Sequence, residues 1–249
     1  MSNILGVYSK TVEVGAGIGS TAKKVVQRTF WFVRMLTKGN YELRALNANH
    51  IPAGPAFVLA KKEFMSVYSP EPDFYIKKTV PGLESLAKRL EKGEENFKIG
   101  ELDEAEQEFY KALRIDEDGP KANIVPSDVH AEKSDYKKLD VVLKRILHND
   151  QVFKEEQRHL FNDFAINLRK DKLFEEAIVY YAKAIELNPD DENLHFNIAR
   201  AFYDRQNKEK CLEHLRKALA INPGFKEARL FLDYCQDGAD KNATNEMTA

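Results

Sequence analysis

Two similar stretches near the C-terminus decide the fold: AIELNPDDEN at residues 184–193 and ALAINPGFKE at residues 218–227, 34 residues apart. The same register extends towards the N-terminus, because a small or apolar residue recurs at intervals of 34, 38 and 34 residues. These four marker residues are Ala105, Leu139, Ala177 and Cys211. A four-residue insertion near residues 154–157 accounts for the longer interval. A fixed period of this length is the sequence signature of a repeat protein.

Each repeat has the pattern of two helices that pack against each other. Four residues after each marker comes a large residue: Phe109, Leu143, Tyr181 and Leu215. Three residues later comes a smaller one in most repeats: Ala112, Ile146, Ala184 and Ala218. Small residues let two antiparallel helices cross closely, and large residues fill the space between neighbouring hairpins. Each hairpin leaves one apolar side uncovered, so only stacking completes the core.

The order of small, large, small and proline residues with a period of 34 resembles the tetratricopeptide repeat. The resemblance covers about residues 86–225, as four repeats at about 86–119, 120–153, 158–191 and 192–225. It implies a mainly α fold, a right-handed α-α superhelix. Residues 226–236 keep an apolar helical stripe and are expected to form the capping helix that covers the last repeat. We therefore expect nine helices over residues 83–236 and no strand between Leu86 and Cys235.

The first helix of the second repeat contains a conflict. A helix that begins near Lys121 would include Pro126 in its second turn, which costs about 3 kcal/mol through a lost hydrogen bond and a steric clash. Ser127 directly after it is a good N-cap residue, and Asp128 suits the first turn of a helix. We therefore expect this helix to be kinked at Pro126 or to begin late, at Ser127.

The N-terminal part of the chain does not repeat and is expected to form a small β unit. TFWFVRML at residues 29–36 and YELRALNAN at residues 41–49 are rich in aromatic and aliphatic residues. The turn-forming residues Lys38, Gly39 and Asn40 lie between them, so the segment predicts a β-hairpin. A third extended segment is expected around Phe57–Leu59.

Residues 69–81, SPEPDFYIKKTVP, are expected to form an extended linker, because residues before proline avoid helix. The β unit is too small to fold alone and should pack on the first repeat. The arrangement resembles small bacterial repeat proteins with a short β segment before the solenoid. The predicted domains are a flexible arm at 1–28, a β unit with linker at 29–80, the solenoid at 81–236 and a disordered tail at 237–249.

Composition narrows the class of function. The chain has 249 residues, is 43% hydrophobic and 31% charged, and has a net charge of −2. No overall basic field exists to attract nucleic acid or anionic lipid. The N-terminus lacks the features of a signal peptide, and no apolar run is long enough for a membrane span. Cys211 and Cys235 are expected to be free thiols in a reducing compartment. These features predict a cytoplasmic protein.

Two motifs suggest chemistry but are better explained without it. The glycine-rich segment from Gly15 to Lys24 matches neither the dinucleotide fingerprint nor the phosphate-loop spacing. A flexible arm is the favoured interpretation, and a phosphate- or nucleotide-handling enzyme is the remote one. Cys211 and His214 share a helix face but lack further ligands, so packing is favoured over metal binding. We predict no catalytic residue, no cofactor and no metal.

The remaining candidate is the concave face, which the resemblance assigns to the first helix of each repeat. The side chains expected there are Phe97, His159, Asn162, Ile166, Arg169, Lys170, Asn193, Phe196, Asn197, Arg200 and Tyr203. Amide side chains can clamp an extended peptide backbone, and the arginines suit an acidic segment. We therefore predict a non-catalytic adaptor that binds an extended, acidic segment of another protein. The alternative is a scaffold that self-associates through its terminal helix or a β edge.

Overall fold

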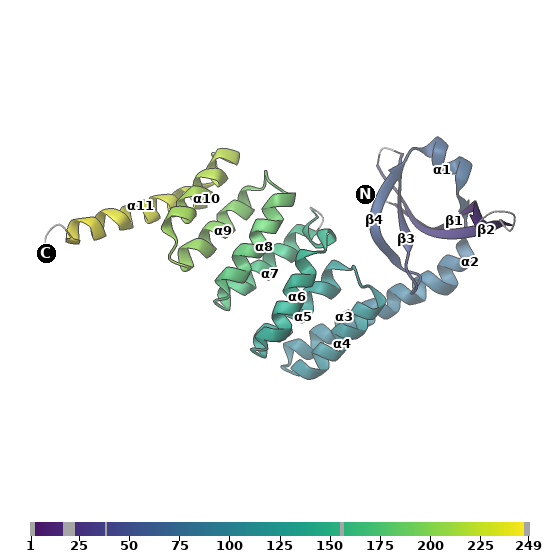
Figure 1. The fold of residues 1–249 in the computed structure, drawn as a ribbon, viewed down its shortest axis with the longest axis horizontal. Helices are drawn as coiled ribbons and strands as arrows, with labels where there is room; N and C mark the ends of the chain where they lie inside the picture. Colours follow the sequence, from purple (N-terminus) through teal and green to yellow (C-terminus); the bar gives the residue numbers. More distant parts are fainter. Residues whose placement is uncertain (1–2, 17–22, 38, 155–156, 247–249) are drawn as a thin grey trace. The chain divides into compact units, whose positions relative to one another are not determined.

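The computed structural model describes residues 3–16, 23–37, 39–154 and 157–246. The chain forms two compact units, Met1–Ala122 and Asn123–Ala249. The first unit contains a β-sheet followed by one helical hairpin, and the second contains the remaining repeat helices (Figure 1). The predicted class is confirmed: the chain is mainly α, with tetratricopeptide-type hairpins after a small N-terminal β-sheet.

The first unit begins with an antiparallel sheet in the order β4-β3-β2-β1-β5. Its strands are β1 (Asn3–Ala16), β2 (Lys23–Met35), β3 (Tyr41–Leu46), β4 (Pro52–Leu59) and β5 (Ser69–Pro70). The predicted hairpin is confirmed, because β2 and β3 pair from Trp31↔Ala45 to Met35↔Tyr41. The third extended segment is also confirmed as part of β4, which pairs with β3.

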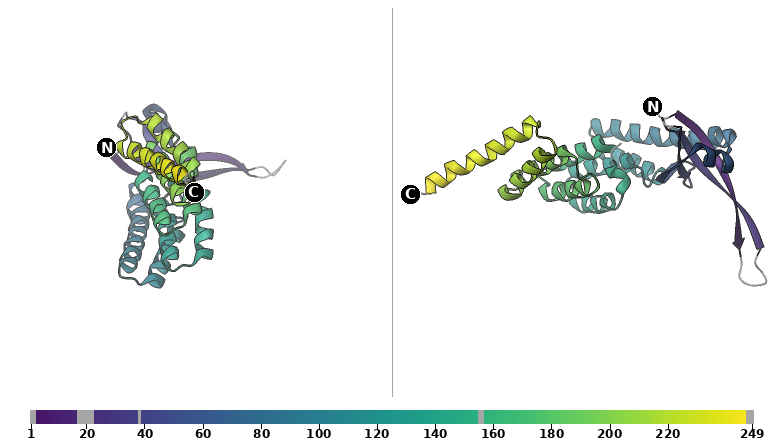
Figure 2. Two further views of the ribbon diagram at one scale, coloured as in Figure 1. Left: turned by 90° about the vertical axis from the view of Figure 1, so that its left-hand side faces the viewer. Right: turned by 90° about the horizontal axis from the view of Figure 1, so that it is seen from above.

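The flexible arm predicted for residues 1–28 is wrong wherever the structure describes it. Strands β1 and β2 pair with each other from Asn3↔Met35 to Ala16↔Lys23. Figure 2 shows this two-stranded ribbon extending past the rest of the sheet. Each strand is rich in β-branched residues, which favour strands, but the chain before residue 29 is not recognisable as strand until β1 and β2 are aligned with each other. The glycine-rich residues 17–22 lie outside the described residues.

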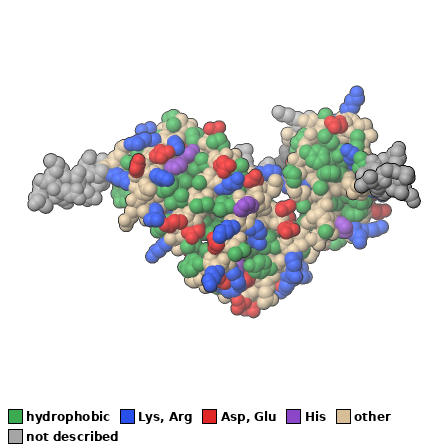
Figure 3. Space-filling view, in the orientation of Figure 1, with side chains coloured by type: hydrophobic (Ala, Val, Ile, Leu, Met, Phe, Trp, Pro, Cys, Tyr) green, Lys and Arg blue, Asp and Glu red, His purple; other side chains and the backbone are tan. Residues whose placement is uncertain are grey.

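Each face of the sheet packs against helical segments. Helix α1 (Lys61–Val67) covers one face, where Phe64 stacks on Tyr41 with ring centroids 4.2 Å apart. On the other face, Phe30 stacks on Phe74 at 4.2 Å in the short helix α2 (Pro72–Phe74). The sheet therefore has a core on both sides. Hydrophobic side chains also gather on the visible surface of this unit (Figure 3).

The extended linker predicted for residues 69–81 is wrong beyond β5. Helix α2 continues through a π-helical turn, η2 (Tyr75–Thr79), into α3 (Val80–Lys98). Pro72 opens α2, where a missing backbone N–H costs nothing. Val80 follows the π-helical turn and donates its N–H to the carbonyl of Tyr75, and Pro81 is the next residue. Such a widened turn is a place where a helix absorbs an irregular residue.

The first repeat hairpin packs on the β unit, as predicted. Helix α3 approaches α4 (Leu102–Ile115) so closely that a Cβ atom at Gly93 would lie 2.3 Å from the ring of Phe109. Asn47 Nδ2 donates to the carbonyl of Ile115 at 2.8 Å, and Asn49 Nδ2 donates to that of Arg114 at 2.8 Å. These side chains satisfy carbonyl groups that the end of a helix leaves without a partner.

The second unit continues the helical hairpins. Its helices are α5 (Pro120–Glu132, which begins in the first unit), α6 (Tyr136–Leu147), a 3-10 turn η3 (Asp150–Phe153), α7 (Arg158–Lys170), α8 (Phe174–Leu187), α9 (Glu192–Asp204), α10 (Lys208–Ile221) and α11 (Lys226–Glu246). Together with α3 and α4 these make the nine α-helices predicted for residues 83–236, and the described residues between Leu86 and Cys235 contain no strand. The insertion near residues 154–157 follows η3.

Two boundaries differ from the prediction. Helix α5 begins at Pro120 and contains Pro126, so a late start at Ser127 is wrong. Helix α11 continues to Glu246, so the segment predicted as a disordered tail is helical up to that residue. That segment contains no proline, and its one glycine, Gly238, does not end the helix.

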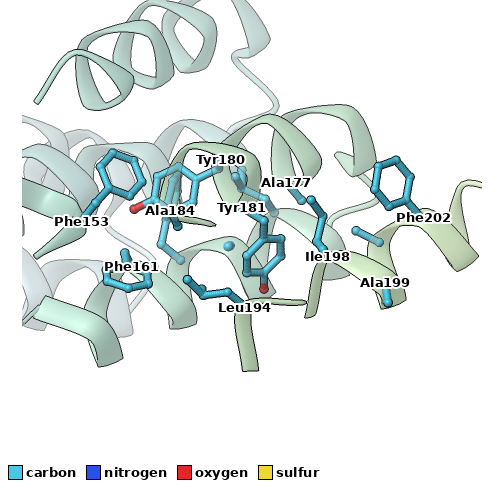
Figure 4. Packing of buried hydrophobic residues seen from close by; sticks show 14 of the residues in the cluster. Phe153, Phe161, Ala177, Tyr180, Tyr181, Ala184, Leu194, Ile198, Ala199 and Phe202 are labelled. Atoms are coloured by element: carbon cyan, nitrogen blue, oxygen red, sulfur yellow. The ribbon is translucent and has the colours of Figure 1, made fainter. Parts of the chain in front are cut away.

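The repeat is also present in the backbone. A residue with positive φ ends the first helix of every hairpin, and the four are spaced like the sequence repeat: Gly100, Ser134, Lys172 and Gln206. After the second and the fourth of these turns a side chain caps the next helix, as Asp135 does by accepting from the N–H of Lys138. The predicted crossing residues Ala177, Ala184, Cys211 and Ala218 are all fully buried. Figure 4 shows the first two within the core. The register assigned from the sequence therefore matches the packing.

Candidate protein-binding face

The predicted concave face lies mainly on α7 and α9 of the second unit. In α7 the core side chains are Phe161, Phe164, Ala165 and Leu168. The predicted residues Asn162, Ile166 and Arg169 are each next to a core position and are half-buried. We use "inner face" for the predicted residues of α7 and α9 together with the side chains that touch them.

Two predicted amide residues contact each other on the inner face. Asn197 Nδ2 of α9 donates to Asn162 Oδ1 of α7 at 2.7 Å, and Asn197 is only 8% exposed. This bond uses one donor and one acceptor. The amide nitrogen of Asn162 and the carbonyl oxygen of Asn197 are not used by it, and they are the donor and acceptor that a peptide backbone requires. The pair also fixes the two amide groups in place.

The two predicted arginines, Arg169 and Arg200, lie near Tyr181. The sequence predicted Tyr181 as a core residue and not as part of the inner face. Burial raises the pKa of the Tyr181 hydroxyl well above its usual value, while the nearby charges of Arg169 and Arg200 lower it. Tyr181 is on α8, and Figure 4 shows its ring between Leu194 and Ile198 of α9. Among the described residues, this buried hydroxyl has no hydrogen-bond partner.

The two arginines differ in how their charge is compensated. Arg169 Nη1 forms a 2.6 Å ion pair with Asp204 Oδ2. Arg200 instead lies over the ring of Phe196, with its Cζ 5.8 Å from the ring centroid. Burial lowers the pKa of Arg200, and repulsion by Arg169 adds to the effect. Arg200 is therefore a partly buried cation that an added anion would stabilise.

The predicted aromatic anchors, Phe196 and Tyr203, contact the capping helix. The ring of Phe196 is 6.2 Å from that of Phe231 in α11, and Tyr203 is 5.2 Å from the same ring. Tyr203 and Tyr234 join their hydroxyls at 3.3 Å, a bond that raises the pKa of Tyr203 to about 12. Helix α11 thus already covers part of the aromatic surface that the sequence assigned to a partner.

The face becomes acidic towards α5. Burial raises the pKa of Asp128 to about 6, although a hydrogen bond with Asn167 of α7 opposes the shift and the charge of Asp171 adds to it. Burial also raises the pKa of Asp171, with a further contribution from Glu132. Three carboxyl groups therefore lie near one another at this end, away from Arg200 in the repeat order.

The other predicted residues are placed less centrally. His159 and Lys170 are exposed near opposite ends of α7. Asn193 is in the first turn of α9, where its backbone N–H donates to the cap residue Asp191. Phe97 is half-buried in α3 of the first unit, so it is not part of this group.

The residues considered for metal binding have other partners. His214 Nδ1 is 3.0 Å from His195 Nδ1, and Cys211 Sγ is 3.8 Å from Cys235 Sγ. Within the described residues, no group of three or more His, Cys, Asp or Glu side chains is arranged to hold a metal ion. Nor does any helix in the described part of the chain have the length and apolar character needed to cross a membrane.

Comparison with known proteins identifies the repeats. Models of the tetratricopeptide repeat match residues 89–118, 169–205 and 192–225. No curated protein matches the chain in sequence. This chain therefore contains tetratricopeptide repeats.

Several solved structures resemble the chain at low similarity. A structure from a functional characterisation of Pseudomonas aeruginosa pilF is 18% identical, with a TM-score of 0.46, and the match covers 65% of this chain and 72% of that one. MamA from Desulfovibrio magneticus is 17% identical, with a TM-score of 0.44 and coverage of 66% and 92%. Cut9–Hcn1 of the APC/C is 19% identical, with a TM-score of 0.41 and coverage of 60% and 29%.

Proposed function

We propose that this protein is a non-catalytic adaptor that binds an extended, acidic segment of another protein on the inner face of its second unit. Tetratricopeptide repeats support a role in protein interaction in general. The specific ligand is inferred from the residues of the inner face. It is an anionic group at Arg200, followed by a peptide backbone along Asn162 and Asn197.

The observation that carries this proposal is the Tyr181 hydroxyl beside Arg200. A buried hydroxyl without a partner costs about 1–3 kcal/mol. Arg200 is a partly buried cation whose pKa is lowered. A carboxylate bound at Arg200 would pair with the guanidinium, and it would accept a hydrogen bond from Tyr181 once the side chains that cover this buried hydroxyl move aside. Both unfavourable features would then be relieved by one ligand group.

The test begins by screening the full chain against a phage-displayed library of peptides with free C-termini. Selected peptides should carry an acidic residue or the terminal carboxylate at a constant position, with an apolar residue near it. Their affinity is then measured by titration calorimetry at low and high salt. Selection of basic peptides would overturn the proposal.

Three variants identify the residues used. Arg200→Ala should weaken binding about tenfold, because charge-assisted hydrogen bonds contribute about 1.5–3 kcal/mol. This effect should shrink at high salt if the site is partly exposed. Asn197→Ala should weaken binding without changing the salt dependence. Tyr181→Phe should weaken binding about fivefold while leaving the stability of the fold unchanged or higher, since it removes a donor without a partner.

The matched control is Lys217→Ala. Lys217 is an exposed residue of α10 that pairs with Glu213 at 2.6 Å. It is on the second helix of the fourth repeat and should not touch a ligand on the inner face. If Lys217→Ala weakens binding as much as Arg200→Ala, the ligand uses another surface.

Self-association through α11 is the second candidate. Leu230 is 69% exposed and Tyr234 is 62% exposed, which is unusual for apolar side chains of a capping helix. Light scattering at increasing protein concentration tests it. A dimer that Leu230→Glu converts to a monomer would favour the scaffold.

A further inference from the structure

A pocket of about 340 Å³ lies on the sheet face that α1 covers in the first unit. Three aromatic side chains line it: Trp31 from β2, Phe57 from β4, and Tyr68 at the end of α1. Lys10 of β1 and Glu63 of α1 also contribute to its wall. A concave site with several aromatic walls and a few charged groups is typical of a binding pocket for a small ligand or a single side chain.

The three rings are arranged as adjoining walls. The centroid of Trp31 is 5.1 Å from that of Phe57, with the ring planes at 80°. It is 6.4 Å from that of Tyr68, with the planes at 86°. The ring of Trp31 is therefore nearly perpendicular to both neighbours. Aromatic faces carry negative potential, so ring walls that enclose a pocket attract a cation.

Contacts within the first unit fix the orientation of two of the three aromatic side chains, Trp31 and Tyr68. Trp31 Nε1 donates to Thr29 Oγ1 at 3.0 Å, which sets the orientation of the indole. Tyr68 is 9% exposed and stacks on Phe64, with centroids 5.4 Å apart and planes at 14°. These contacts exist in the chain by itself, so little ordering is needed when a ligand binds.

The charges around the pocket also favour a cation. Lys10 Nζ lies 5.8 Å from the centroid of the Tyr68 ring, so the chain places one of its own cations there. Burial raises the pKa of the Tyr68 hydroxyl, and the negative charge of Glu63 raises it further. The Glu63 carboxylate is therefore close enough to interact electrostatically with Tyr68 in the wall of the pocket.

We propose that this pocket binds a methylated ammonium group. Aromatic walls stabilise a cation without offering the several hydrogen-bond acceptors that a primary ammonium loses on leaving water. A methylated ammonium is weakly hydrated and can instead fill the space with apolar contacts. Lys10, a primary ammonium on a tethered side chain, acts as the internal competitor. The site belongs to the first unit and does not depend on the ligand proposed for the inner face.

A built-in reporter makes the test direct. Trp31 is the single tryptophan of the chain, so its fluorescence comes from the pocket alone. The full chain is titrated with tetramethylammonium chloride, with sodium chloride at equal ionic strength as the control. We expect a saturable change in Trp31 emission with the first salt only. Equal responses to both salts would overturn the proposal.

The source of the methylated group is distinguished by competition. Choline represents a free small molecule, and a peptide containing trimethyllysine represents a modified protein. Stronger displacement of tetramethylammonium by choline would assign the pocket to a small molecule, and stronger displacement by the peptide would assign it to a protein side chain. Failure of both to displace the probe would overturn the proposal.

Substitutions of the two charged residues should change the affinity for tetramethylammonium in opposite directions. Lys10→Ala should strengthen binding of tetramethylammonium several-fold by removing the competitor. Glu63→Gln and Phe57→Ala should each weaken it about fivefold, in line with the energy of single cation–π and charge contacts. Val58→Ala is the control for Phe57→Ala, because Val58 is the next residue of β4 and is 53% exposed, on the opposite side of the strand.

Far-UV circular dichroism checks that each variant keeps the fold. All four positions are at least partly exposed, so truncation should not unfold the unit. Weaker binding of tetramethylammonium by Lys10→Ala together with stronger binding by Glu63→Gln would contradict the roles assigned to both charges and overturn the proposal. An equal loss of affinity for tetramethylammonium in Val58→Ala and Phe57→Ala would also overturn the proposal.

Discussion

The second and fourth repeat hairpins have nearly the same backbone and very different side chains. Residues 72 apart correspond, and Ser134 and Gln206 occupy the same left-handed turn with φ of 54° and 62°. After the turn, the N–H of Asp135 donates to the carbonyl of His130 at 2.9 Å, as that of Asn207 does to Phe202 at 2.8 Å. Backbone geometry is therefore shared by hairpins whose sequences differ widely.

The corresponding side chains differ in polarity and even in charge. Asp128 corresponds to Arg200, so the inner face changes sign between the two hairpins. Ser127 and Pro126 correspond to Ala199 and Ile198, and Ile146 in the second hairpin corresponds to Ala218 in the fourth. A hairpin of this kind needs complementary volume and a correct turn, and it tolerates most other changes. Substitutions at these corresponding positions test how far the two hairpins are interchangeable.

The largest change in stability is expected for Ile146→Ala, which gives the second hairpin the alanine that the fourth has at the corresponding position, Ala218. Ile146 is fully buried, so truncation should lower the free energy of unfolding by about 2–5 kcal/mol. The urea midpoint followed by circular dichroism measures this loss. Val141→Ala on the same helix is the control, since Val141 is 65% exposed and the change should stay within about 0.5 kcal/mol.

The reverse exchange, Ala218→Ile, should cost less. Ala218 is fully buried, and the added methylenes should destabilise the fourth hairpin by about 1–3 kcal/mol through overpacking. Ala220→Ile, an exposed position on the same helix, is the control for helix propensity. If both exchanges were neutral, the two interiors would be interchangeable and the proposed difference in packing would be wrong.

Asp128→Asn tests the reversed charge and should be stabilising at neutral pH. Burial raises the pKa of Asp128 from 3.8 to about 6, so the folded protein holds its proton more tightly than the unfolded chain. The stability of the natural protein should therefore fall as the pH rises from about 4 to about 6 and then level off. The variant lacks this loss and should be more stable above pH 6 by up to about 3 kcal/mol, which corresponds to a pKa difference of about 2 between the folded and unfolded states.

Denaturant unfolding at two pH values checks the assignment. The natural protein and Asp128→Asn should differ at pH 7 and converge at pH 4. Asp140→Asn, at an exposed carboxyl of α6 whose partner is Lys144, is the control. A difference that persists unchanged at pH 4 would mean that the substitution acts through packing and not through ionisation.

The smallest change in the free energy of unfolding is expected for Pro126→Ala. A proline inside a helix costs about 3 kcal/mol, but the ring is buried, and its two extra methylenes contribute about 1.6 kcal/mol. Proline also restricts the unfolded chain, which offsets a further part of the cost. The variant should therefore gain less than about 1 kcal/mol, measured by urea unfolding. A clear loss would show that the burial of the ring is worth more than the missing hydrogen bond.

Much of the solenoid could be predicted from the sequence because its signals are local and periodic. The intervals between Ala105, Leu139, Ala177 and Cys211 located the helices, the crossing points and the insertion. Helix α5 was harder, because Pro126 and Ser127 are a local signal for a helix start, and the packing of the whole helix overrides it. Strand β1 and the first part of β2, residues 23–28, were missed for a related reason. Strand pairing is a contact between distant residues, and the chain before residue 29 by itself looks like an arm.

Some features of the candidate sites also follow from the sequence, and others depend on the tertiary structure. The sequence by itself determined which helices carry Asn162, Asn197, Arg169 and Arg200, since a period of 34 assigns each residue to a position in its repeat. Only the tertiary structure decided that the two asparagines bond to each other, and that Tyr181 brings a hydroxyl to the arginines from a core position. It alone brings Trp31, Phe57 and Tyr68 together from two strands and a helix end. Periodicity reports the position of a residue in its own helix, whereas a binding site depends on distances between elements that no local pattern encodes.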